Sequence, residues 1–251
     1  EGKARPALDL RRTARFPLAG VVTNQVADSI VEGSPYAIEV ALGFNSNFNM
    51  SAPGTGRWDE AMRKVPYYVH VAPFISEMAE YADIVLPACT FLEEWGYDHC
   101  PPGPGFTEVV VKQPVVEPLY TSRAVADILF DLAFRLGGGI AHSFAGIGDG
   151  AEGFARYRTG AFTTWDELRE RGVWTGQAYE YGKYDRIFDT PSRRFELYSG
   201  NMEALRGETG DGASPSLACL PHYEQATFLG DEGEYPLVLT TYHPLLGMEN
   251  G

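Results

Sequence analysis

The stretch that most constrains how this chain can fold spans residues 74–96 and reads FISEMAEYADIVLPACTFLEEWG. We expect a short helix over residues 76–82 with Ser76 at its N-cap, followed at once by a buried strand over residues 84–87. Pro87 has no N–H to donate to a neighbouring strand, so the strand ends there. A helix that leads directly into a buried strand is half of a parallel α/β unit.

The residues before this stretch show the same alternation of apolar strands and short helices. Strand-like runs cover residues 36–44 and 67–71, and a short amphipathic helix is expected between them at residues 58–64. This order is typical of a parallel sheet with helical crossovers. Such sheets bind ligands beyond the carboxyl ends of their strands. The loop over residues 87–96, which contains two adjacent glutamates, is therefore a candidate wall of a ligand site.

Two further elements follow this loop. Residues 108–112 are expected to form an edge strand that Pro114 ends. The clearest helix of the chain is expected over residues 123–136, where apolar side chains recur at three- and four-residue spacing after a cap at Thr121 or Ser122. This helix is expected to cover one face of the sheet.

The second half of the chain is less regular. Beyond residue 140 the clearest signal is a capping box of Thr164 and Glu167. In the first half of the chain, a further helix is expected over residues 26–32. Short strands are expected at residues 195–198 and 235–241.

Composition excludes several classes of protein. The 251 residues carry a formal net charge of −14, which argues against a nucleic-acid partner because there is no basic stripe to neutralise phosphates. No apolar run approaches the roughly 18 residues that a membrane-spanning helix needs. Cys89, Cys100 and Cys219 are spaced too widely for a disulfide framework or an iron–sulfur site within the chain.

The run EYADIVLPACTFLEEWG, residues 80–96, resembles the large-subunit family of molybdopterin oxidoreductases, which includes DMSO reductase, nitrate reductase and formate dehydrogenase. The run KQPVVEPLYTSRAVADI, residues 112–128, is most similar to the polysulfide and thiosulfate reductases of that family. Members of the family are much longer than this chain, so we expect it to be a fragment of a larger subunit.

The resemblance implies a fold and a domain organisation. The fold class is α/β, with a Rossmann-like parallel sheet and helices on both faces, followed by an irregular linker and the first strand of a second, β-rich domain. Residues 1–140 would form the later part of a domain that binds molybdopterin guanine dinucleotide. Residues 141–233 would be the linker, and residues 234–251 would begin the C-terminal dinucleotide-binding domain.

The cofactor implied by the resemblance is a molybdenum or tungsten ion held by two molybdopterin guanine dinucleotides. The metal would perform two-electron chemistry on a small oxoanion or sulfur compound. We find neither a catalytic residue nor a metal ligand in this chain, because the family's metal ligand comes from an upstream segment. The implied partners are an iron–sulfur electron-transfer subunit and a membrane-anchor subunit, with the iron–sulfur cluster outside this chain. The resemblance favours the extracytoplasmic face of the membrane.

The resemblance also implies cofactor-binding positions. Asn47 matches a residue that touches the dinucleotide, although Phe48 follows it here instead of the family's proline. Val71 and Ala72 stand where the family has a polar pair that ends in Asp, so only their main-chain groups could make contacts. Glu94 stands where some relatives have a Lys that faces the dinucleotide, and we expect this glutamate to point away or to pair with an Arg.

The remaining implied positions lie on the 123–136 helix and near the end of the chain. Asp127 matches the residue whose carboxylate accepts the N1–H and N2–H of guanine, whereas from the residues alone it is an ordinary Asp near a helix start. The run TYHPLLGMEN, residues 241–250, resembles a pterin-contacting loop. Its polar members are Thr241, His243, Glu249 and Asn250.

Two other functions stay open from the sequence. The chain could be a relative without the cofactor that serves as a scaffold or electron-transfer subunit of a quinone-linked respiratory complex, which the departures at Phe48, Ala72 and Glu94 favour. It could also be a Rossmann-like domain for another nucleotide. The lack of a G-x-G-x-x-G run after a strand counts against NAD as that nucleotide.

Overall fold

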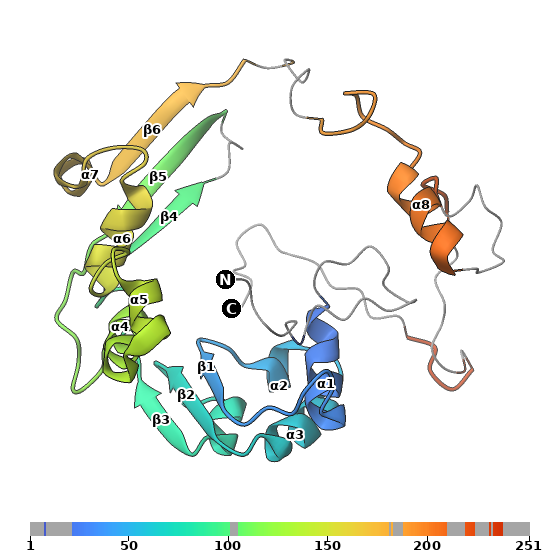
Figure 1. Ribbon diagram of the computed structural model, residues 1–251, viewed down its shortest axis with the longest axis horizontal. Helices are drawn as coiled ribbons and strands as arrows, with labels where there is room; N and C mark the ends of the chain where they lie inside the picture. The colour runs from blue at the N-terminus through green and yellow to red at the C-terminus, as the bar shows by residue number, and fades with distance from the viewer. Residues whose placement is uncertain are drawn as a thin grey trace. The chain divides into compact units, whose positions relative to one another are not determined.

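The structure is a computed structural model that describes residues 8, 22–100, 105–180, 182, 188–209, 219–223, 231 and 233–237. The chain forms two compact units, Glu1–Asp189 and Thr190–Gly251. All the strands of the described residues belong to the first unit (Figure 1). None of the helices in the described parts of the chain is long and apolar enough to cross a membrane.

A three-stranded parallel sheet begins the first unit. Its strands are β1 (Ala41–Phe44), β2 (Tyr68–Ala72) and β3 (Ile84–Pro87), in the order β1-β2-β3. The register aligns Phe44 with Val71, so the carboxyl ends of the strands meet at one edge. A parallel bridge between Ala88 and Arg123 continues the sheet beyond β3. This arrangement confirms the predicted α/β class and its parallel sheet.

Short helices precede β1 and connect the three strands. They are η1 (Thr23–Gln25), α1 (Val26–Glu32), α2 (Phe48–Ser51), α3 (Thr55–Lys64) and the 3-10 helix η2 (Glu77–Tyr81). The bounds of α1 agree with the prediction, and the left-handed Gly33 ends it by donating its N–H to Ile30. The expected helix over residues 76–82 is a single 3-10 turn, and Ser76 makes no side-chain cap.

The core beneath this sheet is built mainly from α3. Met62 packs with Tyr68 of β2 and Met78 of η2, so α3 covers the face of the sheet to which Tyr68 belongs. Trp58 is 2% exposed, and its ring stacks on Phe48 with centroids 4.7 Å apart and planes 13° from parallel. This stack ties α2, which follows β1, to α3.

The opposite face of the sheet is covered much less by the described residues. Leu42 and Ile84 lie on that face, and they are 37% and 41% exposed. The bounds predicted for the 84–87 strand are right, but the expectation that this strand is buried is wrong. The reason is that β3 is the outer strand of the three, with only the bridge at Ala88 beside it.

A separate antiparallel sheet follows in the same unit. Its strands are β4 (Gly96–Cys100), β5 (Phe106–Lys112) and β6 (Val173–Ala178), in the order β4-β5-β6. The predicted edge strand at residues 108–112 is therefore the central strand of this sheet, which corrects the prediction. The sequence analysis missed β4 and β6, because neither has an apolar run. Both pair with β5, which was predicted to be an edge strand.

Four helices pack around the second sheet and the end of the first. They are α4 (Val125–Leu136), α5 (Gly138–Phe144), α6 (Ala151–Thr159) and α7 (Trp165–Arg171). The expected cap of α4 at Thr121 or Ser122 is wrong, because the helix begins after Ala124 and the Ser122 hydroxyl donates to the carbonyl of Leu119. The predicted cap of α7 is confirmed, since Thr164 Oγ1 accepts the Glu167 N–H at 3.4 Å.

The second unit has one described helix, α8 (Gly200–Thr209). The strand expected at residues 195–198 is wrong, because these residues pair with no other strand. Of the strand expected at residues 235–241, residues 235–237 are described and are not in a strand, and the others lie outside the described residues. The predicted domain boundaries at residues 140 and 233 stay predictions.

A buried carboxylate organises the loop after β3. Glu93 is 8% exposed, and its Oε2 accepts the backbone N–H of Thr90 at 2.7 Å and the Thr90 hydroxyl at 2.8 Å. Its Oε1 accepts the backbone N–H of Leu119 at 2.8 Å. The backbone N–H groups of Thr90 and Leu119, together with the Thr90 hydroxyl, hold the pKa of Glu93 below its ordinary value. Glu93 therefore joins the loop after β3 to the segment that leads into α4.

We expect Trp58→Ala to lower the free energy of unfolding by about 3–5 kcal/mol, since it removes a buried ring. Chemical denaturation of the purified protein measures this loss. Phe74→Ala is the matched aromatic control because Phe74 is 77% exposed, and it should cost less than about 1 kcal/mol. Equal losses in the two variants would contradict the stack between α2 and α3.

We expect Glu93→Gln to be less stable than the wild type at neutral pH, because an amide cannot accept hydrogen bonds through both of its terminal atoms. The difference should shrink as the pH falls from about 4.3, the ordinary pKa of Glu, through the lower pKa of folded Glu93, because the wild-type carboxyl is then protonated too.

Thermal unfolding midpoints across this pH range measure the difference. Glu117→Gln, at an exposed carboxylate of the same segment, serves as the control. If the difference in thermal midpoint between Glu93→Gln and the wild type stays constant down to acid pH, the ionised Glu93 carboxylate does not stabilise the fold through these hydrogen bonds.

Candidate functional site

The candidate site lies along the edge formed by the carboxyl ends of β1, β2 and β3. At the β3 end of this edge lies a hollow of about 420 Å³, which we call the rim hollow. Its walls come from the loop after β3, the first turn of α4 and the N-terminus of α6. The side chains on which its chemistry depends are those of Glu94, Arg123 and Asp127. This volume is within the range of small-molecule sites in proteins.

Asp127 projects from the first turn of α4 and is hydrogen-bonded within the chain. Its Oδ1 accepts the N–H of Ala151, the first residue of α6, at 2.7 Å. Gly150 lies so close that a Cβ at this position would meet Asp127 Oδ1. The carboxylate predicted to recognise guanine thus also caps the N-terminus of α6.

Glu94 is half-buried and lines the same hollow. It follows Glu93, whose carboxylate holds Thr90 and Leu119 (the Glu93 clamp). Burial raises the pKa of Glu94 above its ordinary value, and the charges of Asp127 and Glu93 act in the same direction. Lys112 and the backbone N–H of Val125 oppose this rise in pKa. The structure places Glu94 in the lining of the rim hollow, next to the loop that Glu93 holds, and the expectation that it points away from the dinucleotide or pairs with an Arg stays a prediction.

Asn47 lies at the other end of this edge, between β1 and α2. Its Nδ2 donates to Glu77 Oε2 of η2 at 2.6 Å, and this hydrogen bond lowers the pKa of Glu77. The Asn47 Oδ1 atom is shielded from solvent and has no hydrogen-bond partner among the described residues. Asn47 precedes α2 but does not cap it through its side chain, because Glu77 holds the amide.

Val71 and Ala72 end β2 between these two positions. The carbonyl oxygen of Val71 accepts the N–H of Asn45 at 3.0 Å, and that of Ala72 accepts the N–H of Ala88 at 3.1 Å. Both carbonyl groups thus take part in the hydrogen bonding of the sheet and its loops. Because neither side chain is polar, this pair offers little to a ligand.

The structure brings Glu94 and Asp127 together and puts Asn47 at the far end of the same edge. Three steps between neighbouring strands, from β1 to the bridge at Arg123, separate the two ends by roughly 14 Å. The last four predicted positions lie outside the described residues; they are Thr241, His243, Glu249 and Asn250.

Sequence reasoning missed three residues of this edge. Glu77 was not singled out, although it holds Asn47. Arg123 pairs with Asp131 at 3.1 Å and donates to the carbonyl of Asp127 at 3.4 Å, which fixes the start of α4. Gly150 could have been found from the glycine spacing of GIGDGAEG, residues 146–153, because such spacing indicates a tightly packed loop before a helix.

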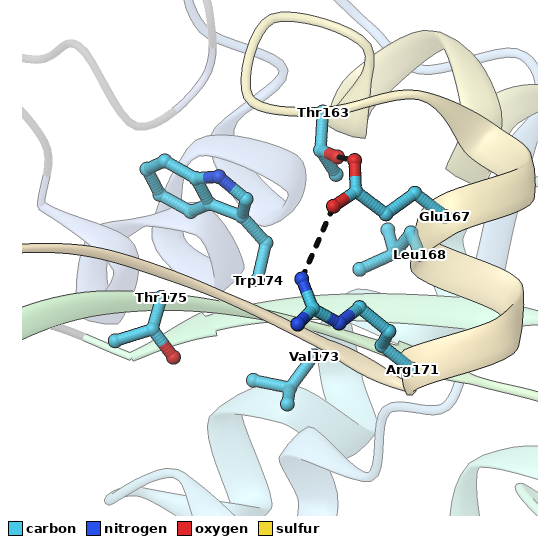
Figure 2. A pocket seen from close by; sticks show the side chains of 7 residues that line it. All are labelled: Thr163, Glu167, Leu168, Arg171, Val173, Trp174 and Thr175. Atoms are coloured by element: carbon cyan, nitrogen blue, oxygen red, sulfur yellow. Dashed lines mark hydrogen bonds and ion pairs between the residues drawn. The ribbon is translucent and has the colours of Figure 1, made fainter.

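A second hollow, of about 540 Å³, lies between α7 and β6 (Figure 2). Glu167 accepts hydrogen bonds from Arg171 at 3.2 Å and from the Thr163 hydroxyl at 2.8 Å, and Trp174 forms the opposite side. Its main charged groups therefore neutralise each other, whereas the rim hollow gathers carboxylates without a matching number of cations. We take the rim hollow, at the edge where parallel sheets bind ligands, as the candidate site.

A metal site is not apparent within the described residues, where no three His, Cys, Asp or Glu side chains gather closely enough to hold an ion.

No protein-family model matches the chain. The chain is 30% identical over 99% of its length to the molybdopterin-containing subunit ArrA of arsenate respiratory reductase from Shewanella sp. (strain ANA-3), of which it covers 35%. It is 27% identical over 90% of its length to the thiosulfate reductase molybdopterin-containing subunit PhsA from Salmonella typhimurium, of which it covers 33%. The chain thus spans about a third of the length of the curated relatives it matches.

Among solved structures, acetylene hydratase from Pelobacter acetylenicus is similar with a TM-score of 0.65. The match covers 87% of this chain and 28% of that protein at 23% sequence identity, so it supports the fold alone. The end-to-end similarity to molybdopterin-containing subunits agrees with this fold, and the chain belongs to the molybdopterin oxidoreductase family, also called the DMSO reductase family.

Proposed function

We propose that this chain is part of the catalytic subunit of a molybdenum or tungsten oxidoreductase and that the carboxyl edge of its parallel sheet holds a molybdopterin guanine dinucleotide. The observation that carries this proposal is the polar lining of the sheet's carboxyl edge. Glu94 and Asp127 lie at one end and Asn47 at the other. The separation of roughly 14 Å suits an extended dinucleotide rather than a single small substrate.

The residues at both ends fit the parts of such a cofactor. The edge of guanine presents the donors N1–H and N2–H, and carboxylates such as Glu94 and Asp127 are acceptors. At the other end, the buried Oδ1 of Asn47 needs a donor, because a buried acceptor without a partner is costly. The diphosphate would lie between the two ends, since carboxylates near phosphates would repel them.

When it is bound, the cofactor's metal supplies two-electron redox chemistry, and the protein residues bind and orient the group. We propose a small oxoanion or sulfur compound as the substrate. The similarity to an arsenate respiratory reductase subunit and to a thiosulfate reductase subunit supports this class. An iron–sulfur subunit, with a membrane anchor, would then exchange electrons with the metal.

A relative without the cofactor, acting as a scaffold or electron-transfer subunit of a quinone-linked respiratory complex, is the second candidate. Ala72 favours it, because the residue that ends β2 has no side chain to accept a hydrogen bond from a ribose or base. Glu94 favours it too, since the family resemblance implies that some relatives have a Lys at this position, and a carboxylate near the diphosphate would weaken binding.

Elemental analysis of the full-length protein decides between the two candidates. We expect molybdenum or tungsten in an amount comparable with the protein, together with guanine nucleotide released by acid hydrolysis. Iron measured in the same sample is the control for loss of cofactors during purification. Iron–sulfur content that is intact while molybdenum, tungsten and guanine nucleotide are all near zero would reject the catalytic proposal and support the scaffold.

A further inference from the structure

The side-chain amide of Asn47 is held in one orientation by a carboxylate of η2. Its Nδ2 donates to Glu77 Oε2 at 2.6 Å. A carboxylate only accepts hydrogen bonds, so the reversed amide would bring two acceptors together. This hydrogen bond and the backbone N–H of Glu77 itself hold the pKa of Glu77 below its ordinary value, so the group is ionised at neutral pH.

The backbone at Asn47 is fixed as well. The Asn47 carbonyl accepts the N–H of Met50 at 3.1 Å and that of Ser51 at 2.9 Å, and the Ser51 hydroxyl donates to it at 2.9 Å. The next residue, Phe48, donates its N–H to Met78 Sδ of η2 at 3.1 Å. Two successive residues at the start of α2 are therefore joined to two successive residues of η2.

This arrangement determines which atom of the Asn47 amide is left for a ligand. Its Oδ1 is shielded from solvent and accepts no hydrogen bond from the described residues. Because Nδ2 is bound to Glu77, the amide can receive an N–H or O–H donor but not a phosphate oxygen. A shielded acceptor without a donor is costly, so a bound group that supplies the donor gains from this arrangement.

Asn49 is held in the same way but belongs to the core. Its Nδ2 donates to Asp59 Oδ1 of α3 at 2.5 Å, and the Tyr81 hydroxyl donates to the same oxygen at 2.8 Å. Asn49 is 5% exposed, and its Oδ1 also lacks a partner within the described part of the chain. Asn49 and Asp59 thus join α2 to α3, and they provide a matched structural control for Asn47 and Glu77.

We propose that Glu77 is a positioning residue of the dinucleotide site, which holds the Asn47 amide so that its Oδ1 accepts an N–H or O–H donor of the bound cofactor. Because the cofactor is itself proposed, this role rests on the proposed function. Glu77 acts through Asn47 and does not contact the cofactor. It therefore differs from a residue that only stabilises the fold, and also from a second contact residue.

The rate at which the purified full-length enzyme releases its cofactor measures this role. Released cofactor is followed as guanine nucleotide in a filtrate after acid hydrolysis. Asn47→Ala and Glu77→Ala should each speed release by about three- to tenfold, the effect expected for one lost hydrogen bond. Glu77→Gln should release at a rate between Glu77→Ala and the wild type, because its amide oxygen can still accept from Asn47 Nδ2.

The variant that combines Asn47→Ala with Glu77→Ala tests whether Glu77 acts through Asn47. It should release the cofactor no faster than Asn47→Ala alone, because Glu77 then has no amide to hold. The thermal midpoint of the cofactor-free chain, made in cells that cannot synthesise the pterin, separates this role from a structural one. For Glu77→Ala it should stay within about 2 °C of the wild type, since the lost hydrogen bond is exposed.

Two controls accompany these variants. Glu80→Ala removes another exposed carboxylate of η2 and should change neither the release rate nor the thermal midpoint. Asp59→Ala leaves Asn49 without its acceptor, so it should lower the thermal midpoint. Measured well below that midpoint, its release rate should stay close to that of the wild type.

The proposed role of Glu77 is overturned by any of three results. These are a wild-type release rate in Glu77→Ala, a combined variant that is faster than Asn47→Ala by the full effect of Glu77→Ala, and an Asp59→Ala enzyme that releases as fast as Glu77→Ala. In each case a wild type that carries guanine nucleotide leaves the proposed function standing. A wild type without guanine nucleotide or metal overturns the proposed function and the role of Glu77 together.

Discussion

The hydrogen bonds accepted by Glu93 are the constraint on which the candidate site depends. One carboxylate holds Thr90 of the loop after β3 and Leu119 of the segment before α4, so two loops about 30 residues apart act as one wall. Glu94 follows the clamp directly and therefore faces the rim hollow. The same clamp brings the segment before α4 to the end of the sheet, where Arg123 pairs with Ala88 and Asp127 reaches α6.

Local patterns in the sequence were enough to predict most of the parallel sheet. The bounds of α1 and β3 agree with the prediction, because Gly33 and Pro87 stop the chain from continuing and each acts on its own neighbours. The antiparallel sheet was missed, because β6 pairs with a strand about 65 residues earlier and its own sequence, VWTGQA, has no apolar run. Pairing over such distances leaves no local signal. The strand expected at residues 195–198 shows the opposite error, because a local pattern that favours a strand occurs where the structure has none.

The location of the candidate site could be predicted from the sequence, but the arrangement of its side chains could not. The edge where parallel strands end follows from the order of elements, and Asn47 and Asp127 both lie along it. The hydrogen bond to Asp127 does not follow from the sequence, since its donor is the N–H of Ala151, 24 residues later. The partner of Asn47, Glu77, is 30 residues away and belongs to a 3-10 turn with no distinguishing pattern.

The central claim is that the carboxyl edge of β1, β2 and β3 binds a guanine dinucleotide with its base in the rim hollow. An experimental density map of the purified full-length enzyme tests this most directly. We expect planar purine density in the hollow, with its amino edge within hydrogen-bonding distance of the Glu94 or Asp127 carboxylate and continuous density along the edge toward Asn47. A hollow that contains only solvent in a map that resolves the surrounding side chains would contradict it.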